Sequence, residues 1–254
     1  MSDNQDVPER EALIAFGSNL GDRESTWQEA VSLLVDRGVT ILGVSQLVET
    51  KPVGGPDGQA SFLNAALTVR TTDSPERLVS ELLAIEREIG RVRARRWGPR
   101  LVDLDLMLYE QQVCDTVPCL VPHPRMTFRR FMLEPACEVA ADWIHPLTQC
   151  SLGDLLQQLN AFDRRAELRL AAFDGEFDRE DVPTVVRALE QMGWSVSDNR
   201  EVREREAEPA WSIVISDQRQ PSAGMVAGPY LVLSTAERST WEAEIVAAVQ
   251  AMSR

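Results

Sequence analysis

Residues Leu101–Leu108 read L-V-D-L-D-L-M-L, and apolar residues alternate with acidic ones along this stretch. Alternation with a period of two is typical of a β-strand that buries one face. Side chains at positions i and i+2 then lie on the same face. We therefore expect Asp103 and Asp105 to lie side by side, with Leu104 pointing the other way into the core.

The residues before this strand have the pattern of further strands and helices. Ser74 and Pro75 are expected as N-cap and first helical residue, and Gly90 as the stop of that helix. The expected elements are strands at 12–16, 39–49 and 62–71 and helices at 24–35 and 75–89, with a Gly- and Pro-rich loop at 50–60. The order strand-helix-strand-strand-helix-strand predicts an α+β fold, an antiparallel-rich sheet with helices on one face.

The C-terminal part of the chain has a different character. A helix is expected at 152–159, and beyond it strands at 168–173, 211–216 and 230–234 and helices at 181–192 and 241–252. The charge run at 200–209 is most simply a solvated linker. We therefore predict a flexible tail at 1–10, a main domain at 11–165 and a small α/β appendage at 166–254, which serves association or regulation.

Composition excludes several classes of function. The 254 residues include 40 acidic and 26 basic side chains, which gives a net charge of −14. Such an acidic protein is a poor general partner for nucleic acid, because phosphate backbones need a basic surface. We expect no membrane segment, since no apolar run reaches about 18 residues. Lys51 is the only lysine, which leaves arginine to bind any phosphate.

The four cysteines, Cys114, Cys119, Cys137 and Cys150, include no C-x-x-C pair, and only two histidines accompany them. A structural zinc site is therefore not expected. With no apolar signal core at the N-terminus, we predict a cytoplasmic protein with reduced, mostly buried thiols.

Basic residues precede the acidic strand. Five arginines lie within ten residues, at 91, 93, 95, 96 and 100. The planar guanidinium group suits phosphate oxygens, and Mg²⁺ prefers one or two carboxylates together with substrate phosphates. Carboxylates for a metal beside arginines for phosphates are what phosphoryl transfer requires. The alternative is a half-exposed strand with two surface aspartates.

The stretch R-W-G-P-R-x-x-D-L-D-L-M at 96–107 resembles the signature of the 6-hydroxymethyl-7,8-dihydropterin pyrophosphokinases of the folate pathway. Four further segments strengthen the resemblance: F-G-S-N-L-G-D-R, T-K-P-V-G-G, F-L-N-A-A and V-P-H-P-R-M-x-x-R-x-F-M-L, in the expected order. It covers residues 11–165. The family transfers diphosphate from ATP to the hydroxymethyl group of the pterin and releases AMP. The resemblance implies a ferredoxin-like α+β fold and two Mg²⁺ ions.

Site residues follow from this resemblance position by position. Asp103 and Asp105 match the ligands of both magnesium ions, and Arg91 and Arg93 match a catalytic loop that closes over the triphosphate. The remaining positions that match ATP contacts are Glu86, Trp97, Arg100, His123 and Arg129.

Pterin contacts follow in the same way. Phe62 and Phe131 match the two rings that sandwich the pterin, and Asn64 matches the amide that reads its edge. Thr50 and Val53 match positions whose backbone completes the edge, and Trp97 matches part of the closing loop.

The sequence departs from the family pattern at some positions. Lys51 replaces a usual second proline, Pro118 an occasional arginine and Leu83 an occasional glutamine. The arginine loop is also one residue shorter. These departures concern ligand affinity more than the metal pair. The main alternative function is a non-catalytic scaffold that binds pterin or nucleotide, and self-association through the C-terminal region is a further possibility.

Overall fold

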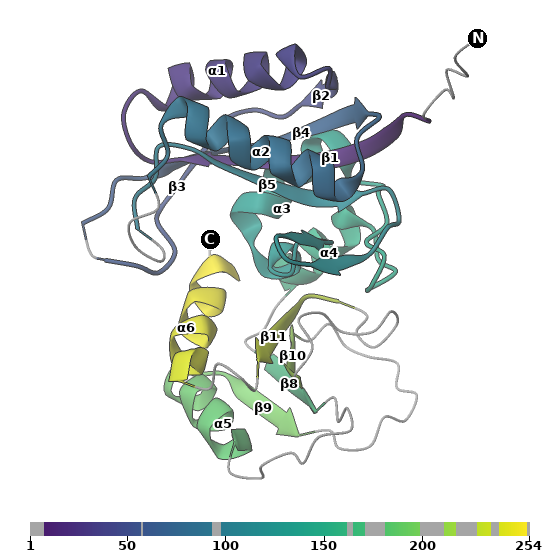
Figure 1. The fold of residues 1–254 in the computed structure, drawn as a ribbon. Helices are drawn as coiled ribbons and strands as arrows, with labels where there is room; N and C mark the ends of the chain where they lie inside the picture. The colour runs from purple at the N-terminus through teal and green to yellow at the C-terminus, as the bar shows by residue number, and fades with distance from the viewer. Residues whose placement is uncertain are drawn as a thin grey trace. The chain divides into compact units, whose positions relative to one another are not determined.

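The computed structural model describes residues 8–56, 58–92, 98–161, 165–170, 181–198, 211–216, 228–234 and 239–252 (Figure 1). The chain forms two compact units. The first unit runs to His123 and includes Glu138–Ala140, and the second comprises Pro124–Cys137 and the chain from Ala141 onward. Residues 124–137 therefore pack with the C-terminal part of the chain, although the predicted domain boundary lies at 165.

The first unit is built on a five-stranded antiparallel sheet. Its strands are β1 (Arg10–Ser18), β2 (Thr40–Val44), β3 (Val48–Thr50), β4 (Phe62–Thr71) and β5 (Asp103–Tyr109). They run in the order β2-β4-β1-β5, and β3 also pairs with β4. Strand β1 lies between β4 and β5 and is antiparallel to both. This arrangement confirms the predicted α+β sheet.

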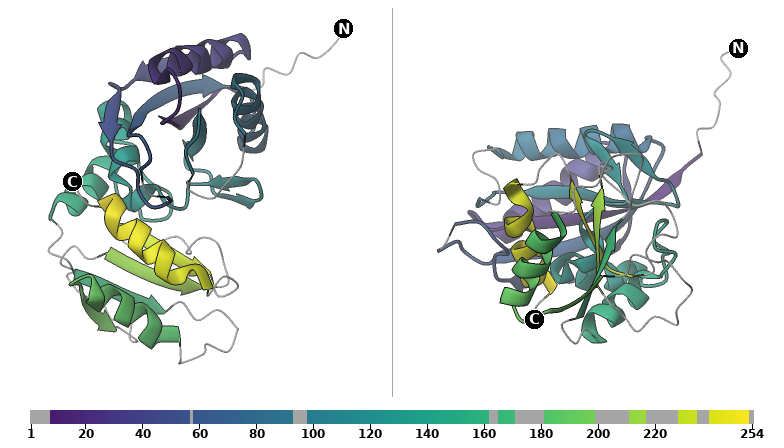
Figure 2. Two further views of the ribbon diagram at one scale, coloured as in Figure 1. Left: turned by 90° about the vertical axis from the view of Figure 1, so that its left-hand side faces the viewer. Right: turned by 90° about the horizontal axis from the view of Figure 1, so that it is seen from below.

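Two helices, α1 (Arg23–Asp36) and α2 (Pro75–Ile89), lie side by side on one face of the sheet (Figures 1 and 2). Ser74 accepts a hydrogen bond from Arg77 N at the start of α2, and Gly90 ends it in the left-handed conformation with φ 103°. The sequence predicts both caps correctly. Phe16, Leu67 and Leu104 are in the core on this side of the sheet.

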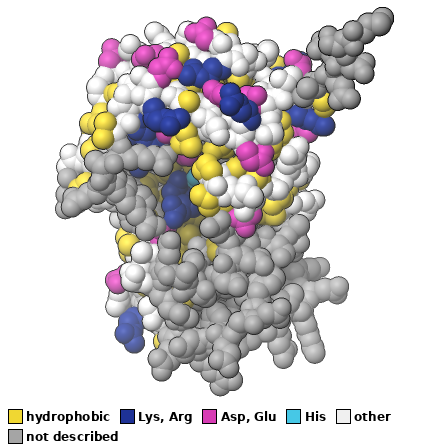
Figure 3. Space-filling model, in the orientation of Figure 1, with side chains coloured by type: hydrophobic (Ala, Val, Ile, Leu, Met, Phe, Trp, Pro, Cys, Tyr) yellow, Lys and Arg dark blue, Asp and Glu magenta, His cyan; other side chains and the backbone are white. Residues whose placement is uncertain are grey.

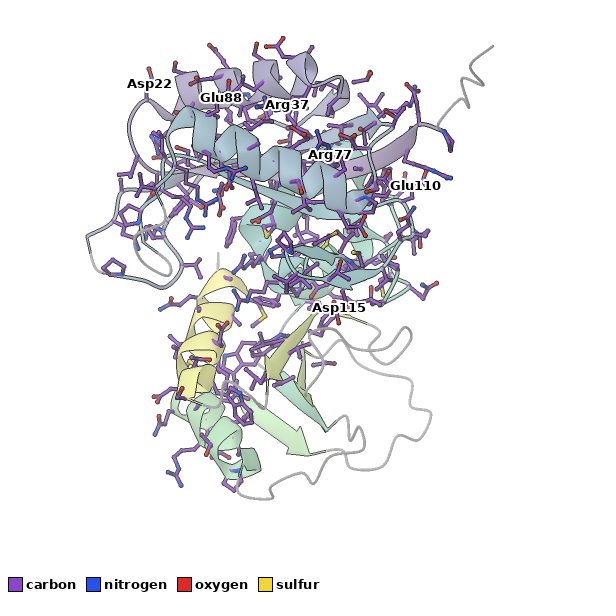
Figure 4. The ribbon with its side chains drawn as sticks, in the orientation of Figure 1. Asp22, Arg37, Arg77, Glu88, Glu110 and Asp115 are labelled. Atoms are coloured by element: carbon purple, nitrogen blue, oxygen red, sulfur yellow. The ribbon has the colours of Figure 1, made fainter. Side chains whose placement is uncertain are left out.

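Charged side chains of both signs mingle on the outer surface of these helices (Figure 3). Arg37, which follows α1, donates to Glu81 at 3.0 Å and to Glu88 at 2.6 Å (Figure 4). Both carboxylates belong to α2. The arginine therefore ties the two helices together at their solvent side.

The predicted strand at 39–49 is two strands in the structure. The β2–β4 register shifts between Ile41 and Gly43, and a Cβ on Gly43 would lie 2.7 Å from Thr68 Oγ1. Ser45 then replaces a strand contact with its side chain, because its hydroxyl accepts a hydrogen bond from Ala66 N at 2.9 Å. The loose alternation of the sequence does not reveal this interruption.

A short hairpin of β6 (Cys114–Thr116) and β7 (Cys119–Val121) completes the first unit. All four cysteines are free thiols, and Cys114 and Cys119 are buried as predicted. The Cys114 thiol donates to Glu76 Oε1 at 3.3 Å. Donor atoms of Glu76, Cys114 and Cys119 lie within 4.8 Å of one another, a grouping that the sequence spacing does not predict.

The second unit contains η1 (Met126–Phe128), α3 (Arg130–Ala140, whose last three residues belong to the first unit) and α4 (Leu152–Ala161). Its parallel sheet has the order β11-β10-β8-β9, with strands β8 (Arg165–Leu170), β9 (Ser195–Asp198), β10 (Trp211–Ser216) and β11 (Tyr230–Ser234). Helices α5 (Asp181–Gln191) and α6 (Trp241–Met252) lie side by side on one face of it (Figure 2).

Most boundaries agree with the predicted elements to within two or three residues. Residues 1–7 and the charge run at 200–209 lie outside the described residues, and Arg10 already belongs to β1. Helix α3 was not predicted, since Pro135 interrupts its pattern. None of the described helices has the length and apolar character of a membrane span.

Candidate active site

The register of three strands places the predicted polar residues in one row. Gly17 of β1 is paired with Asn64 of β4 on one side and with Asp103 of β5 on the other. Asp105 is paired with Ala15, two residues along the same face. The row lies on the sheet face opposite Leu104, which is 4% exposed and in the core. Asp103 and Asp105 therefore share one face, as predicted.

Gly17 leaves open space between the side chains of Asn64, Phe62 and Asp103. A Cβ at this position would lie 3.5 Å from Asn64 Oδ1, 3.8 Å from Phe62 Cδ1 and 3.9 Å from Asp103 Cβ. One aromatic ring, one amide and one carboxylate thus surround the same point on β1. A side chain larger than a methyl group would fill the space that they share.

The carboxylate of Asp103 is held by two arginines. Arg91 Nη1 donates to Oδ1 and Arg100 Nη1 donates to Oδ2. The side chains of Arg91, Arg100 and Asp103 are 14%, 23% and 20% exposed, so water screens these ion pairs only in part. The strand therefore begins with a carboxylate whose two oxygens both face guanidinium groups.

Glu86 of α2 contacts both Arg91 and the start of β5. The residue is 2% exposed, and its Oε1 accepts hydrogen bonds from Leu104 N at 2.9 Å and from Arg91. Burial raises the pKa of the Glu86 carboxyl, while the bond from Leu104 and the charge of Arg91 act against that rise. Glu86 thus orients Arg91 and fixes the start of β5.

Arg91 is charged in spite of its environment. Burial opposes the charge, but Asp103 and Glu86 outweigh it, so the pKa of the guanidinium is raised above its ordinary value. A permanently charged group is therefore held next to Asp103.

Asp105 lies closer to solvent than Asp103, with 38% of its side chain exposed. His123 Nε2 lies 3.9 Å from Asp105 Oδ2. The histidine is fixed by its backbone, because His123 N donates to Met107 O at 2.9 Å. The structure therefore brings His123 close to Asp105, and its expected contact with the phosphates stays a prediction.

Asn64 is held in one orientation at the other end of the row. It is 4% exposed, and its Nδ2 donates to Thr50 Oγ1 at 2.8 Å. Phe62 lies two residues before it, and the Arg100 guanidinium is stacked over the Phe62 ring at 5.7 Å. Val53 lies half-buried in the loop after β3. Phe62 and Asn64, two of the predicted pterin contacts, thus lie next to Gly17 and in the same row as Asp103.

Asn19 lies in the F-G-S-N-L-G-D-R segment and is not among the predicted site residues. It is 2% exposed, and its Oδ1 accepts a hydrogen bond from Arg100 N at 2.7 Å. Its Nδ2 donates to Ala60 O at 3.2 Å. Asn19 therefore ties the loop after β1 to the residues before β4 and before β5. Its neighbours in the G-S-N-L-G-D-R motif were the only signal in the sequence.

Other predicted residues are placed elsewhere or not described. Arg93 and Trp97 lie outside the described residues. Arg129 and Phe131 belong to the second unit, where the Arg129 guanidinium lies 5.5 Å from the centre of the Phe131 ring. The sandwich of Phe62 and Phe131 stays a prediction.

The carboxylates of Asp103 and Asp105 are the type of ligand that suits a magnesium ion. Mg²⁺ prefers oxygen ligands and usually takes one or two protein carboxylates, with water and phosphate oxygens completing its shell. Asp103 and Asp105 offer two carboxylates on one face, and the thiols of Cys114 and Cys119 lie on other strands, β6 and β7. These residues fit a hard cation bridged to phosphates.

A family model described as 7,8-dihydro-6-hydroxymethylpterin-pyrophosphokinase (HPPK) matches residues 13–141. The 2-amino-4-hydroxy-6-hydroxymethyldihydropteridine pyrophosphokinase of Bacillus subtilis is 46% identical over 129 residues, which span 50% of this chain and 77% of that protein. The protein of the same name from Haemophilus influenzae is 37% identical over 148 residues, 58% of this chain and 91% of that one. A crystal structure of Plasmodium falciparum HPPK-DHPS is 11% identical, covers 82% of this chain and 57% of that one, and has a TM-score of 0.45.

Proposed function

The chain belongs to the 7,8-dihydro-6-hydroxymethylpterin-pyrophosphokinase family, and we propose that the residues around Gly17 and Asp103 carry out the family's reaction. The protein is a diphosphokinase of folate biosynthesis, which transfers diphosphate from ATP to the hydroxymethyl group of the dihydropterin. The observation that carries the assignment of the site is the row in which Asn64, Gly17 and Asp103 are paired across three strands.

The transfer makes one bond and breaks one bond. The hydroxymethyl oxygen bonds to the β-phosphorus of ATP, the bond from that phosphorus to the oxygen bridging the α- and β-phosphates breaks, and the hydroxyl proton passes to solvent. AMP leaves with the bridging oxygen. Two Mg²⁺ ions held by Asp103 and Asp105 would supply charge neutralisation for the phosphates.

In this proposal, Arg91 and Arg100 change their hydrogen-bond partners when ATP binds. Arg91 and Arg100 donate to Asp103 in the structure, and both would turn to phosphate oxygens when ATP binds. The carboxylate oxygens of Asp103 would then be available to hold a cation that neutralises phosphate charge. Glu86 is buried, so we assign it the task of directing Arg91 to ATP. His123, Arg129 and the loop residues Arg93 and Trp97 complete the phosphate contacts in this proposal.

The pterin takes the other end of the row. Asn64 reads its edge, with Thr50 and Val53 beside it, and Phe62, Phe131 and Trp97 cover its faces. The Thr50 hydroxyl fixes the Asn64 amide through the 2.8 Å hydrogen bond. Because an amide group that is already oriented loses little entropy on binding, this contact favours recognition of one edge.

Three further assignments are also proposals. The strand order β2-β4-β1-β5 with α1 and α2 on one face supports a ferredoxin-like arrangement for the first unit. Four free thiols suit a cytoplasmic location. Self-association through the C-terminal region would be tested by sedimentation velocity.

Product analysis tests the proposed function. The full chain is incubated with ATP, Mg²⁺ and 6-hydroxymethyl-7,8-dihydropterin, and the nucleotides are separated by chromatography. AMP and pterin diphosphate in equal amounts are expected, and a chelator should abolish both. ADP as the product would indicate transfer of one phosphate, and the absence of any product would favour the non-catalytic scaffold.

A further inference from the structure

The segment from Arg125 to Phe131 contains two residues that are expected to contact the ligands, Arg129 and Phe131. It belongs to the second compact unit, together with the C-terminal part of the chain. That C-terminal part lies mostly beyond the family match, which ends at residue 141. The described contacts of this segment therefore show how residues beyond the family match hold residues within it.

Arg130 stands between the two expected ligand contacts and is buried, with 7% of its surface exposed. Its guanidinium donates to Leu159 O and to Asn160 Oδ1 in the last turn of α4. It also donates to Met252 O, the last residue of α6. Carbonyls at the end of a helix lack partners within the helix and favour a nearby cation. One arginine thus closes the ends of two helices.

Two further side chains of the segment contact the C-terminal region. Thr127 is fully buried, and its hydroxyl accepts a hydrogen bond from Tyr230 N at 3.1 Å and donates to Tyr230 O at 3.2 Å. Arg125 forms an ion pair at 2.9 Å with Glu244 of α6, whose side chain is 9% exposed. Both partners lie about 100 residues further along the chain.

Packing fixes the same turn. Phe128 is 2% exposed and Trp211 is fully buried, and their ring centres lie 6.3 Å apart. Four residues of the segment therefore contact parts of the chain beyond the family match: residues 125, 127, 128 and 130. The backbone of Arg129 is therefore held on both sides in sequence, and that of Phe131 is held at the residue before it.

We propose that Arg130 is a positioning residue and that α6 and β11 set the geometry of Arg129 and Phe131 for ATP and pterin. This inference rests on the proposed function, which assigns those two residues to the ligands. A displacement of about 1 Å at a reacting group can reduce catalysis by up to about 100-fold. The C-terminal region then contributes to catalysis without touching the substrates.

Glu244→Gln and its matched control Glu242→Gln test the proposal in the full chain. Both residues lie in the first turn of α6, both changes remove one charge, and only Glu244 pairs with Arg125. We expect Glu244→Gln to raise the pterin KM or lower kcat by roughly fivefold and Glu242→Gln to stay within twofold of the wild type. Thermal unfolding is measured in parallel, and the assays are run where each variant is folded.

Thr127→Val and Arg130→Lys extend the test to the other two contacts. Thr127→Val keeps the shape but removes the bonds to Tyr230, so it should raise KM for ATP or pterin. Arg130→Lys keeps the charge without the planar fork, and we expect it to retain more activity than Arg130→Gln. If Arg130→Gln fails to fold, Thr127→Val and Glu244→Gln still decide the matter.

Folded variants whose KM and kcat all equal those of the wild type would overturn the positioning role and leave a purely structural one. That result is distinct from failure of the proposed function, because a wild-type protein without AMP formation would refute the latter. A double variant at Arg125 and Glu244 that is no worse than either single variant would further support the pair as one unit.

Discussion

Asp103 of the first unit and Arg130 of the second unit are both charged and largely buried, but different kinds of contact fix their positions. Asp103 stands in a strand, where register with β1 sets its neighbours. Arg130 stands at the start of α3, and helix ends 29 and 122 residues away set its position. Local alternation makes the first arrangement visible in the sequence, whereas only the folded chain reveals the second.

The largest effect should come from the strand carboxylates. Asp105→Ala removes a proposed metal ligand, and we expect AMP formation to fall by roughly 1,000-fold or more, since charge on the phosphates is no longer neutralised. Asp115→Ala, at an exposed position of the hairpin strand β6, is the matched control (Figure 4). Equal activity of both variants would break the link between the strand register and the chemistry.

The shared face of Asp103 and Asp105 is a feature that local sequence patterns predict. The alternation of Leu101–Leu108 and the caps at Ser74 and Gly90 are local patterns, so the sequence alone predicts the strand, the helix and the shared face of Asp103 and Asp105. The split at Ser45 and the helix through Pro135 depend on contacts with distant residues and were missed. The anchoring of Arg130 has no local pattern at all.

His145 of the second unit should give a sizeable pH effect on stability. Burial lowers the pKa of His145 to about 4 from 6.5. The unfolded chain therefore binds more protons between these values, and stability falls as pH decreases from about 6.5 to about 4, by up to about 3 kcal/mol. Urea unfolding at several pH values measures this slope.

His145→Asn provides the control for that slope. His145 Nδ1 accepts hydrogen bonds from Leu147 N at 3.3 Å and Thr148 N at 3.2 Å, and an asparagine oxygen can accept both without titrating. The difference in stability between wild type and variant should then shrink as pH falls through the window. A difference independent of pH would show that His145 titrates alike in both states.

Gly17 tests the proposed pterin end of the row, on the sheet of the first unit. Gly17→Val puts methyl groups into the space between Asn64, Phe62 and Asp103, and we expect the pterin KM to rise about tenfold because the edge-reading amide is obstructed. Gly153→Ala in α4 serves as a glycine control with an ordinary contact distance of 3.4 Å. An unchanged KM in Gly17→Val would place the pterin elsewhere.

The smallest effect concerns the surface charges of the first unit. Glu88 pairs with Arg37 at 2.6 Å, but its side chain is 52% exposed. Solvent and salt screen such a pair, so Glu88→Gln should change the free energy of unfolding by less than about 0.5 kcal/mol. A loss of several kcal/mol in chemical denaturation would contradict the distinction between exposed and buried charges.

Magnesium binding tests the central assignment most directly. Titration of Mg²⁺ into the protein with a non-hydrolysable ATP analogue, followed by calorimetry, compares the wild type with Asp103→Asn, which keeps the shape of the side chain. We predict two ions per wild-type chain and, in the variant, the loss of at least one ion or a drop in affinity of more than about tenfold. The same stoichiometry and affinity in both proteins would contradict the account.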